Sequence, residues 1–153
     1  MKFIRINEVR PFGRGIILED YLTEMASVGI IGGMQIFVRT NDAGKIPHFH
    51  IWDANSRGTD KKKGFHTCIR IDKCEYFLHE GKMDTIDDKK ARELLVNFLK
   101  SKSSSKRFKD FTNWQVLVAL WNMNNSDVEV DEDIEMPDYT QLKAPSKGKK
   151  GQI

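Results

Sequence analysis

The sequence predicts an α+β fold: a small, mainly antiparallel sheet of about four to five strands, covered by two C-terminal helices and followed by an extended acidic arm. Two observations support this class. The β-branched and aromatic runs come first along the chain, and the segments with helical apolar spacing come after residue 85. A chain of 153 residues, 39% of them hydrophobic, is long enough to bury one core.

Strands are expected in the first half of the chain. Five segments have the alternation, or the β-branched and aromatic content, of strands: residues 2–9, 34–40, 48–53, 65–72 and 74–80. Residues 41–44 (NDAG) have the composition of a turn between two of them. Residues 16–28 have mixed periodicity, and we expect a short helix or an irregular covering segment there.

Two helices are expected after the strands. Thr85 and Asp88 have the spacing of a capping box, with Asp in place of the usual Glu or Gln. The apolar residues that follow form one helical stripe: Ala91, Leu94, Leu95, Phe98 and Leu99. A second helix is expected from about Lys109 to Asn124. Its Trp114 and Trp121 are seven residues apart, which is the spacing of core residues.

Charge divides the chain into a basic body, an acidic arm and a basic tip. The 25 Lys and Arg exceed the 22 Asp and Glu by only three, but residues 110–142 contain no Lys or Arg. Seven acids lie between Asp127 and Asp138, and four lysines follow. We therefore divide the chain into an α+β domain over residues 1–125 and an arm with a basic tip over residues 126–153. A protein partner is expected at residues 127–153, and RNA is an alternative partner for the basic body.

All four histidines lie in one 32-residue window, together with both cysteines. His48 and His50 are two residues apart on an expected strand, so their imidazoles should point to the same face. A divalent ion such as zinc would suit this pair with His79 as a third ligand. Acid–base catalysis by His48, His50 and His66 would suit it equally, and imidazoles with a purely structural role remain a third interpretation.

Several neighbouring residues are expected to bind a ligand at such a site. Trp52 shares the strand face of His48 and His50 and could stack on a ligand. Cations that could contact phosphate are found nearby in the sequence: Lys45, Lys61, Lys62, Lys63, Arg70 and Lys82. Cys68 could join a mixed His/Cys zinc site if its strand is regular, but for Cys68 and Cys74 we favour buried free thiols.

Residues 33–125 resemble a bacterial family built on a domain of unknown function. The matching motifs are Pro47-His48-Phe49-His50, Glu80-Gly81-Lys82-Met83 and the helix positions Leu94, Leu95 and Trp121. The resemblance implies a small cytosolic protein, of a kind often encoded beside a second small domain in toxin–antitoxin-like pairs. The loop with Lys61 to Lys63, the first 32 residues and the acidic arm depart from the family pattern.

Two functions from different classes follow. The first is a small toxin–antitoxin-like protein that acts on RNA or another phosphate-containing substrate through the histidines. The second is a non-catalytic interaction module, such as a phage or accessory assembly protein, that binds its partner through the arm. The first residues interleave charges with apolar side chains, unlike a signal peptide, and no apolar run reaches the roughly 18 residues of a membrane span. We expect a cytoplasmic protein without membrane contact.

Overall fold

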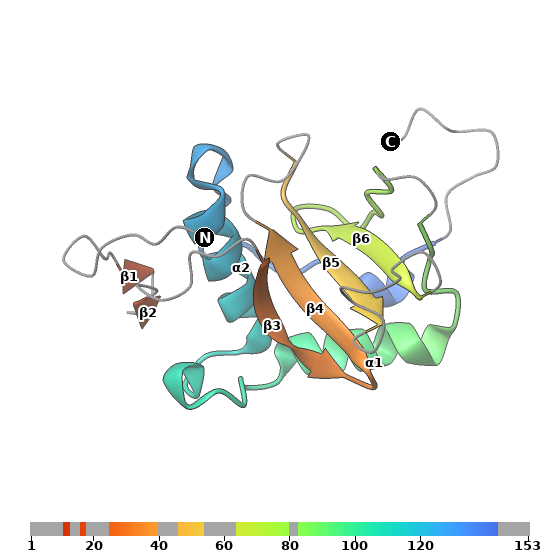
Figure 1. Ribbon diagram of the computed structural model, residues 1–153, viewed down its shortest axis with the longest axis horizontal. Helices are drawn as coiled ribbons and strands as arrows, with labels where there is room; N and C mark the ends of the chain where they lie inside the picture. Colours follow the sequence, from red (N-terminus) through yellow and green to blue (C-terminus); the bar gives the residue numbers. More distant parts are fainter. Residues whose placement is uncertain are drawn as a thin grey trace.

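An antiparallel sheet of four strands, in the order β3-β4-β5-β6, forms the centre of the computed structural model (Figure 1). The structure describes residues 11–12, 16–17, 25–39, 46–53, 64–79 and 83–143. The strands of this sheet are β3 (Met25–Ile31), β4 (Met34–Arg39), β5 (His48–Asp53) and β6 (His66–Arg70). A separate two-stranded sheet pairs β1 (Pro11–Phe12) with β2 (Ile16–Ile17).

Two helices pack against the sheet, α1 (Lys89–Lys100) and α2 (Asn113–Asn124), and confirm the predicted α+β class. Among the described residues, short 3-10 helices accompany them: η3 (Lys106–Phe108), η4 (Ser126–Val128) and η5 (Tyr139–Gln141). Alternation along the strands divides the sheet into two faces. Residues such as Ile36, Phe49 and Ile69 join the hydrophobic core with α1 and α2. The opposite face carries the histidines of β5.

The strands expected at residues 34–40, 48–53 and 65–72 are confirmed as β4, β5 and β6. The prediction for residues 16–28 is wrong, because Ile16–Ile17 and Met25–Ile31 are strands. Gly32 and Gly33 have φ of 56° and 80°, which allows the two-residue turn that joins β3 to β4. A β-bulge between Ser27 and Gly29 interrupts the alternation of β3 and hides its period. The strand expected at residues 2–9 lies outside the described residues.

The strand expected at residues 74–80 is wrong for residues 74–79, the part of this range that the structure describes. This part makes one bridge to the sheet, between Tyr76 and Ile69. Beyond it, the Phe77 amide donates to the Cys68 carbonyl at 2.9 Å, and the Asp84 amide donates to the His66 carbonyl at 2.8 Å. The segment therefore follows the outer edge of β6 without a continuous ladder.

Both helices exist where the apolar spacing predicts them, but their caps differ from the prediction. Asp88, not Thr85, caps α1: its carboxylate accepts from the Lys90 amide at 3.2 Å, whereas the Thr85 hydroxyl donates to Asp87. The predicted capping box at Thr85 is therefore wrong. A capping box does form at α2, between Thr112 and Gln115. Because residues 106–108 form η3, α2 begins four residues later than the predicted Lys109.

The acidic segment, residues 126–143, is held against α2 by hydrogen bonds and is called the acidic strap below. The Trp121 and Trp114 indoles donate to the carbonyls of Val128 and Ile134, at 2.9 and 3.0 Å. The Asn122 amide donates to the Val130 carbonyl at 2.9 Å and accepts from the Val130 amide at 2.8 Å. The seven acids of the strap are all exposed.

The end of the strap enters the core. Tyr139 and Leu142 are buried, and the Tyr139 hydroxyl donates to the Arg70 carbonyl at 2.5 Å. Burial, with smaller contributions from the nearby Cys74 and Asp72, holds the pKa of the Tyr139 phenol well above its usual range.

We expect Asn122→Ala to lower the free energy of unfolding by about 2 kcal/mol, because it leaves both polar groups of the Val130 backbone without their partner. Urea unfolding in the presence of a chelator measures this change. The matched control is Asn97→Ala on the exposed side of α1, for which we expect a change within about 0.5 kcal/mol. Equal effects of the two substitutions would contradict the structural role of Asn122.

Tyr139 makes stability depend on alkaline pH. Its pKa is raised in the folded state, so its contribution is complete below about pH 10, where the unfolded phenol titrates, and is lost as pH rises beyond that value. Tyr139→Phe should flatten this loss in unfolding curves between pH 8 and about 11. It should also cost about 1 kcal/mol at neutral pH for the lost hydrogen bond. Burial also raises the pKa of Tyr76. The Tyr139→Phe variant should therefore keep the part of the pH dependence of stability that Tyr76 contributes.

Candidate metal centre

The pairing of β5 with β6 brings three side chains of the site, those of His48, His50 and Cys68, to one face of the sheet, with His66 beside them. His50 lies opposite Cys68 in the register, and Trp52 lies opposite His66. Paired residues share a face, as do residues two apart along a regular strand. His48, His50, His66 and Cys68 therefore project to the same side, as predicted for the two histidines of β5.

The segment along the outer edge of β6 supplies the fourth side chain. The Phe77 amide is tied to the Cys68 carbonyl, and the rings of Phe77 and His79 stack with their centroids 4.4 Å apart. His79 Nε2 then lies 3.4 Å from Cys68 Sγ. A residue that is 11 positions away in the chain thus becomes a direct neighbour of the cysteine.

His48, His50, Cys68 and His79 form a compact donor group, which we call the His/Cys cluster. One donor atom from each residue lies within 4.8 Å of all the others. Cys68 Sγ is 3.8 Å from His50 Nε2 and 3.4 Å from His79 Nε2. Ordinary zinc–sulfur and zinc–nitrogen lengths in a tetrahedron place neighbouring S and N donors about 3.5 Å apart. These two separations are close to those of a tetrahedral site.

A hydrogen bond to a backbone carbonyl orients His48. Its Nδ1 lies 2.6 Å from the Ile46 carbonyl oxygen, which can only accept, so Nδ1 carries the proton. The lone pair of the neutral ring is then on Nε2. Histidine ligands of metal ions characteristically donate their other ring N–H to a carbonyl or a carboxylate in this way.

The cluster is buried among aromatic side chains. His48, His50 and Cys68 have no exposed surface, and His79 is partly buried. The Phe37 ring stacks on the His50 ring, with their centroids 4.9 Å apart. The ring centroid of His48 is 4.8 Å from that of Phe77 and 5.5 Å from that of Trp121. Such surroundings exclude water and strengthen the electrostatic interaction of a bound cation with its ligands.

His66, predicted as catalytic with His48 and His50, lies beside the cluster and outside the group of four. Its Nε2 is 3.1 Å from His50 Nδ1, and 9% of the residue is exposed. The predicted metal ligand His79 does lie with His48 and His50. Cys68, predicted to be a buried free thiol, is free and buried, and it is also a member of the group of four. The sequence does indicate this position of Cys68, because residues two apart on a regular strand share a face and Cys68 lies two residues after His66.

Of the other predicted binding residues, Trp52 lies on the sheet face of the cluster, as predicted, and Arg70 pairs with Asp72. Trp52 is 6% exposed and donates from its indole to Gln35 at 3.0 Å.

Arg70 makes two hydrogen bonds of 2.9 Å with Asp72. The bond to Asp72 raises the pKa of Arg70 despite the opposing effect of burial. For Asp72, burial acts to raise the pKa. The hydrogen bond and the charge of Arg70 outweigh this effect, so the pKa of Asp72 is lowered. The predicted phosphate-binding lysines lie outside the described residues: Lys45, Lys61, Lys62, Lys63 and Lys82.

Cys74 is separate from the cluster. Its thiol donates to the Asp138 carbonyl at 3.1 Å, and burial, followed by the charges of Asp138 and Glu75, raises its pKa. A raised pKa favours the neutral thiol over the thiolate that binds metal ions or reacts. Cys74 therefore serves as a natural comparison for Cys68.

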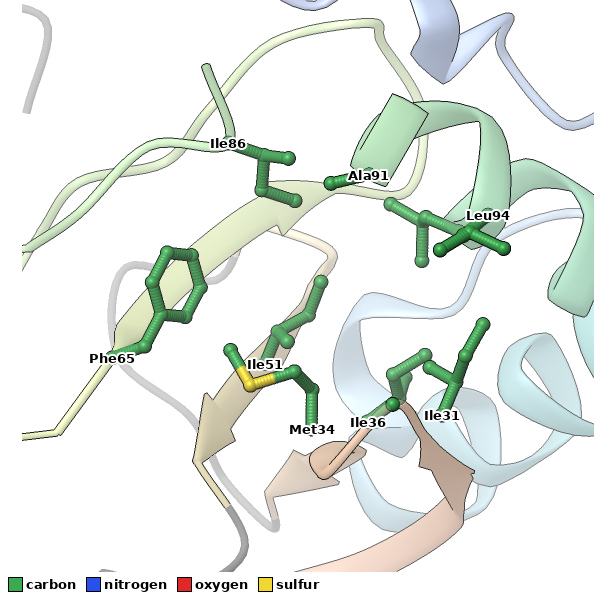
Figure 2. Close-up of a pocket in the computed structure, with 10 residues that line it drawn as sticks. Ile31, Met34, Ile36, Ile51, Phe65, Ile86, Ala91 and Leu94 are labelled. Carbon is green, nitrogen blue, oxygen red and sulfur yellow. The ribbon is translucent and has the colours of Figure 1, made fainter. Parts of the chain in front are cut away.

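An apolar pocket of about 210 Å³ opens on the opposite face of the sheet, beside α1 (Figure 2). Figure 2 shows Ile51, Met34 and Phe65 from the sheet side facing Ile86, Ala91 and Leu94. None of the described residues that line it is ionisable. Leu94, predicted in the apolar stripe of α1, is 56% exposed and lines this pocket.

No protein-family model matches this chain, and no curated protein or solved structure matches it. The resemblance to the bacterial family named above therefore stays a prediction. Among the described residues, no helix has both the length and the apolar character needed to span a bilayer.

Proposed function

We propose that this protein binds a divalent transition-metal ion of the zinc class at His48, His50, Cys68 and His79. The observation that carries the proposal is the convergence of four donor atoms, from two strands and an edge segment, within 4.8 Å in a buried aromatic setting. Three imidazoles and one thiol are a donor set that Mg²⁺ and Ca²⁺, which prefer oxygen, do not favour. Zinc accepts both nitrogen and sulfur at tetrahedral sites.

The proposed ion has a structural role. Zinc sites with four protein ligands are closed, whereas catalytic sites usually keep one position for water or substrate. The ligands come from β5, from β6 and from the edge segment that carries His79. Bound metal would fasten this segment to the sheet, and its binding free energy would add to the stability of the fold.

Catalysis on RNA or another phosphate-containing substrate stays a second proposal. It needs His48 and His50 to reach a substrate, and neither ring has exposed surface in the structure. Their burial favours the metal centre. A toxin–antitoxin-like context stays a prediction as well. Binding of a protein partner at residues 127–153 is supported only by the exposure of the seven carboxylates of the acidic strap, which would favour a basic surface.

Metal analysis of the untagged protein tests the proposed centre. After loading with Zn²⁺ and removal of excess, we expect about one bound zinc per chain in the wild type and almost none in Cys68→Ser or His48→Ala/His50→Ala. Cys74→Ser is the matched control and should retain the metal, because Cys74 is not in the cluster. A wild-type protein that retains no Zn²⁺, Co²⁺ or Fe²⁺ would contradict the proposal.

Thermal unfolding provides an independent measurement. Free Zn²⁺ at about 100 times its dissociation constant should stabilise the wild type by about 2.7 kcal/mol, and a chelator should remove this gain. Cys68→Ser should show no dependence on zinc, while Cys74→Ser should respond like the wild type. An equal response of both serine variants would place zinc elsewhere on the chain.

A further inference from the structure

The inference concerns His66 and rests on the proposed metal centre. His66 is the one histidine outside the donor group of four, and its Nε2 lies 3.1 Å from His50 Nδ1. The planes of the two rings differ by only 15°, and their centroids are 5.4 Å apart. Each ring nitrogen lies about 1.15 Å from the centroid of its own ring. If the two centroids and the two bonded nitrogens lie on one line, an N–H···N distance of 3.1 Å therefore gives a centroid separation of about 5.4 Å. The rings therefore meet edge to edge, as a hydrogen bond requires.

This bond decides which nitrogen of His50 faces the metal. A neutral imidazole has one N–H and one lone pair, so only one of its nitrogens can bind an ion. Cys68 Sγ is 3.1 Å from His50 Nδ1 and 3.8 Å from Nε2, and distance alone leaves both nitrogens open. If His50 Nδ1 donates this bond to His66 Nε2, the lone pair that can bind the ion is on His50 Nε2. His48 has the same arrangement, with Nδ1 bonded to the Ile46 carbonyl.

The surroundings of His66 hold its ring in place. Its backbone amide donates to the Asp84 carboxylate at 2.9 Å, and its carbonyl accepts from the Asp84 amide at 2.8 Å. The Trp52 ring, across the β5–β6 pair, lies 5.8 Å from the His66 ring. His66 is also slightly exposed, whereas His50 is not. It therefore occupies the boundary between the buried cluster and solvent.

We propose that His66 is a positioning residue of the metal centre: its Nε2 accepts the Nδ1 proton of His50 and so directs His50 to bind the ion through Nε2. His66 is not itself a ligand. Outer-shell partners of this type fix the tautomer and the orientation of a ligand ring, and their loss typically weakens metal binding 10- to 100-fold.

The test compares the zinc affinity of the full-length wild type, His66→Phe and His66→Gln in competition with a chromophoric chelator. We expect His66→Phe, which keeps a planar ring without an acceptor, to bind zinc 10- to 100-fold more weakly. His66→Gln offers an amide oxygen as acceptor and should recover most of the affinity. Thr67→Val is the matched control: Thr67 is the next residue on β6, is buried, and its side chain points to the opposite face.

Nitrogen-15 NMR of the zinc-loaded proteins gives a readout that a general loss of packing would not reproduce. In the wild type and His66→Gln we expect His50 to be protonated at Nδ1, with Nε2 showing the shift of a metal-bound nitrogen. In His66→Phe we expect His50 to lose this single tautomer while His48, held by Ile46, retains it.

Three outcomes overturn the inference. Wild-type affinity and an unchanged His50 tautomer in His66→Phe would show that His66 does not position His50. A metal-bound nitrogen on His66 in the wild type would make it a ligand. A wild type without bound metal would remove the centre, and this role with it, whereas the first two outcomes leave the centre intact.

Discussion

The antiparallel register between β5 and β6 is the constraint on which the rest of the structure depends. It places His50 opposite Cys68 and Trp52 opposite His66, with every donor of these strands on one face. A shift of one residue would turn Cys68 and His66 toward the helices and bring Thr67 and Ile69 to the site. The same register keeps Phe49, Ile51 and Ile69 in the core beneath α1 and α2. Hydrophobic burial on one face thus specifies the chemistry on the other.

The outer edge of β6 connects the site to the rest of the chain. The segment around Phe77 follows this edge and brings His79 to Cys68, while Tyr139 of the acidic strap bonds to the Arg70 carbonyl at the end of β6. An uncovered edge strand is open to pairing with other chains, so this cover also protects the sheet. The site, the edge and the strap therefore depend on one strand of five residues.

Local patterns in the sequence predicted much of this arrangement. Alternation identified β4, β5 and β6, and helical spacing located α1 and α2. The failures occurred where local signals were interrupted or competed. The bulge of β3 broke its alternation, residues 74–80 have strand composition but make one bridge, and Asp88 displaced Thr85 as the cap of α1. The bulge and the single bridge depend on pairing with a neighbouring strand, whereas the cap was decided locally, by the bond from the Lys90 amide to Asp88.

The sequence by itself determined that His48 and His50 share a face, because side chains two apart on any strand point the same way. It could not determine that Cys68 and His79 complete the group or that His66 lies beside it. Those positions follow from which strands are neighbours, from their register and from the path of the chain along the edge of β6. These are set by burial of the core as a whole, a long-range property that no local spacing encodes.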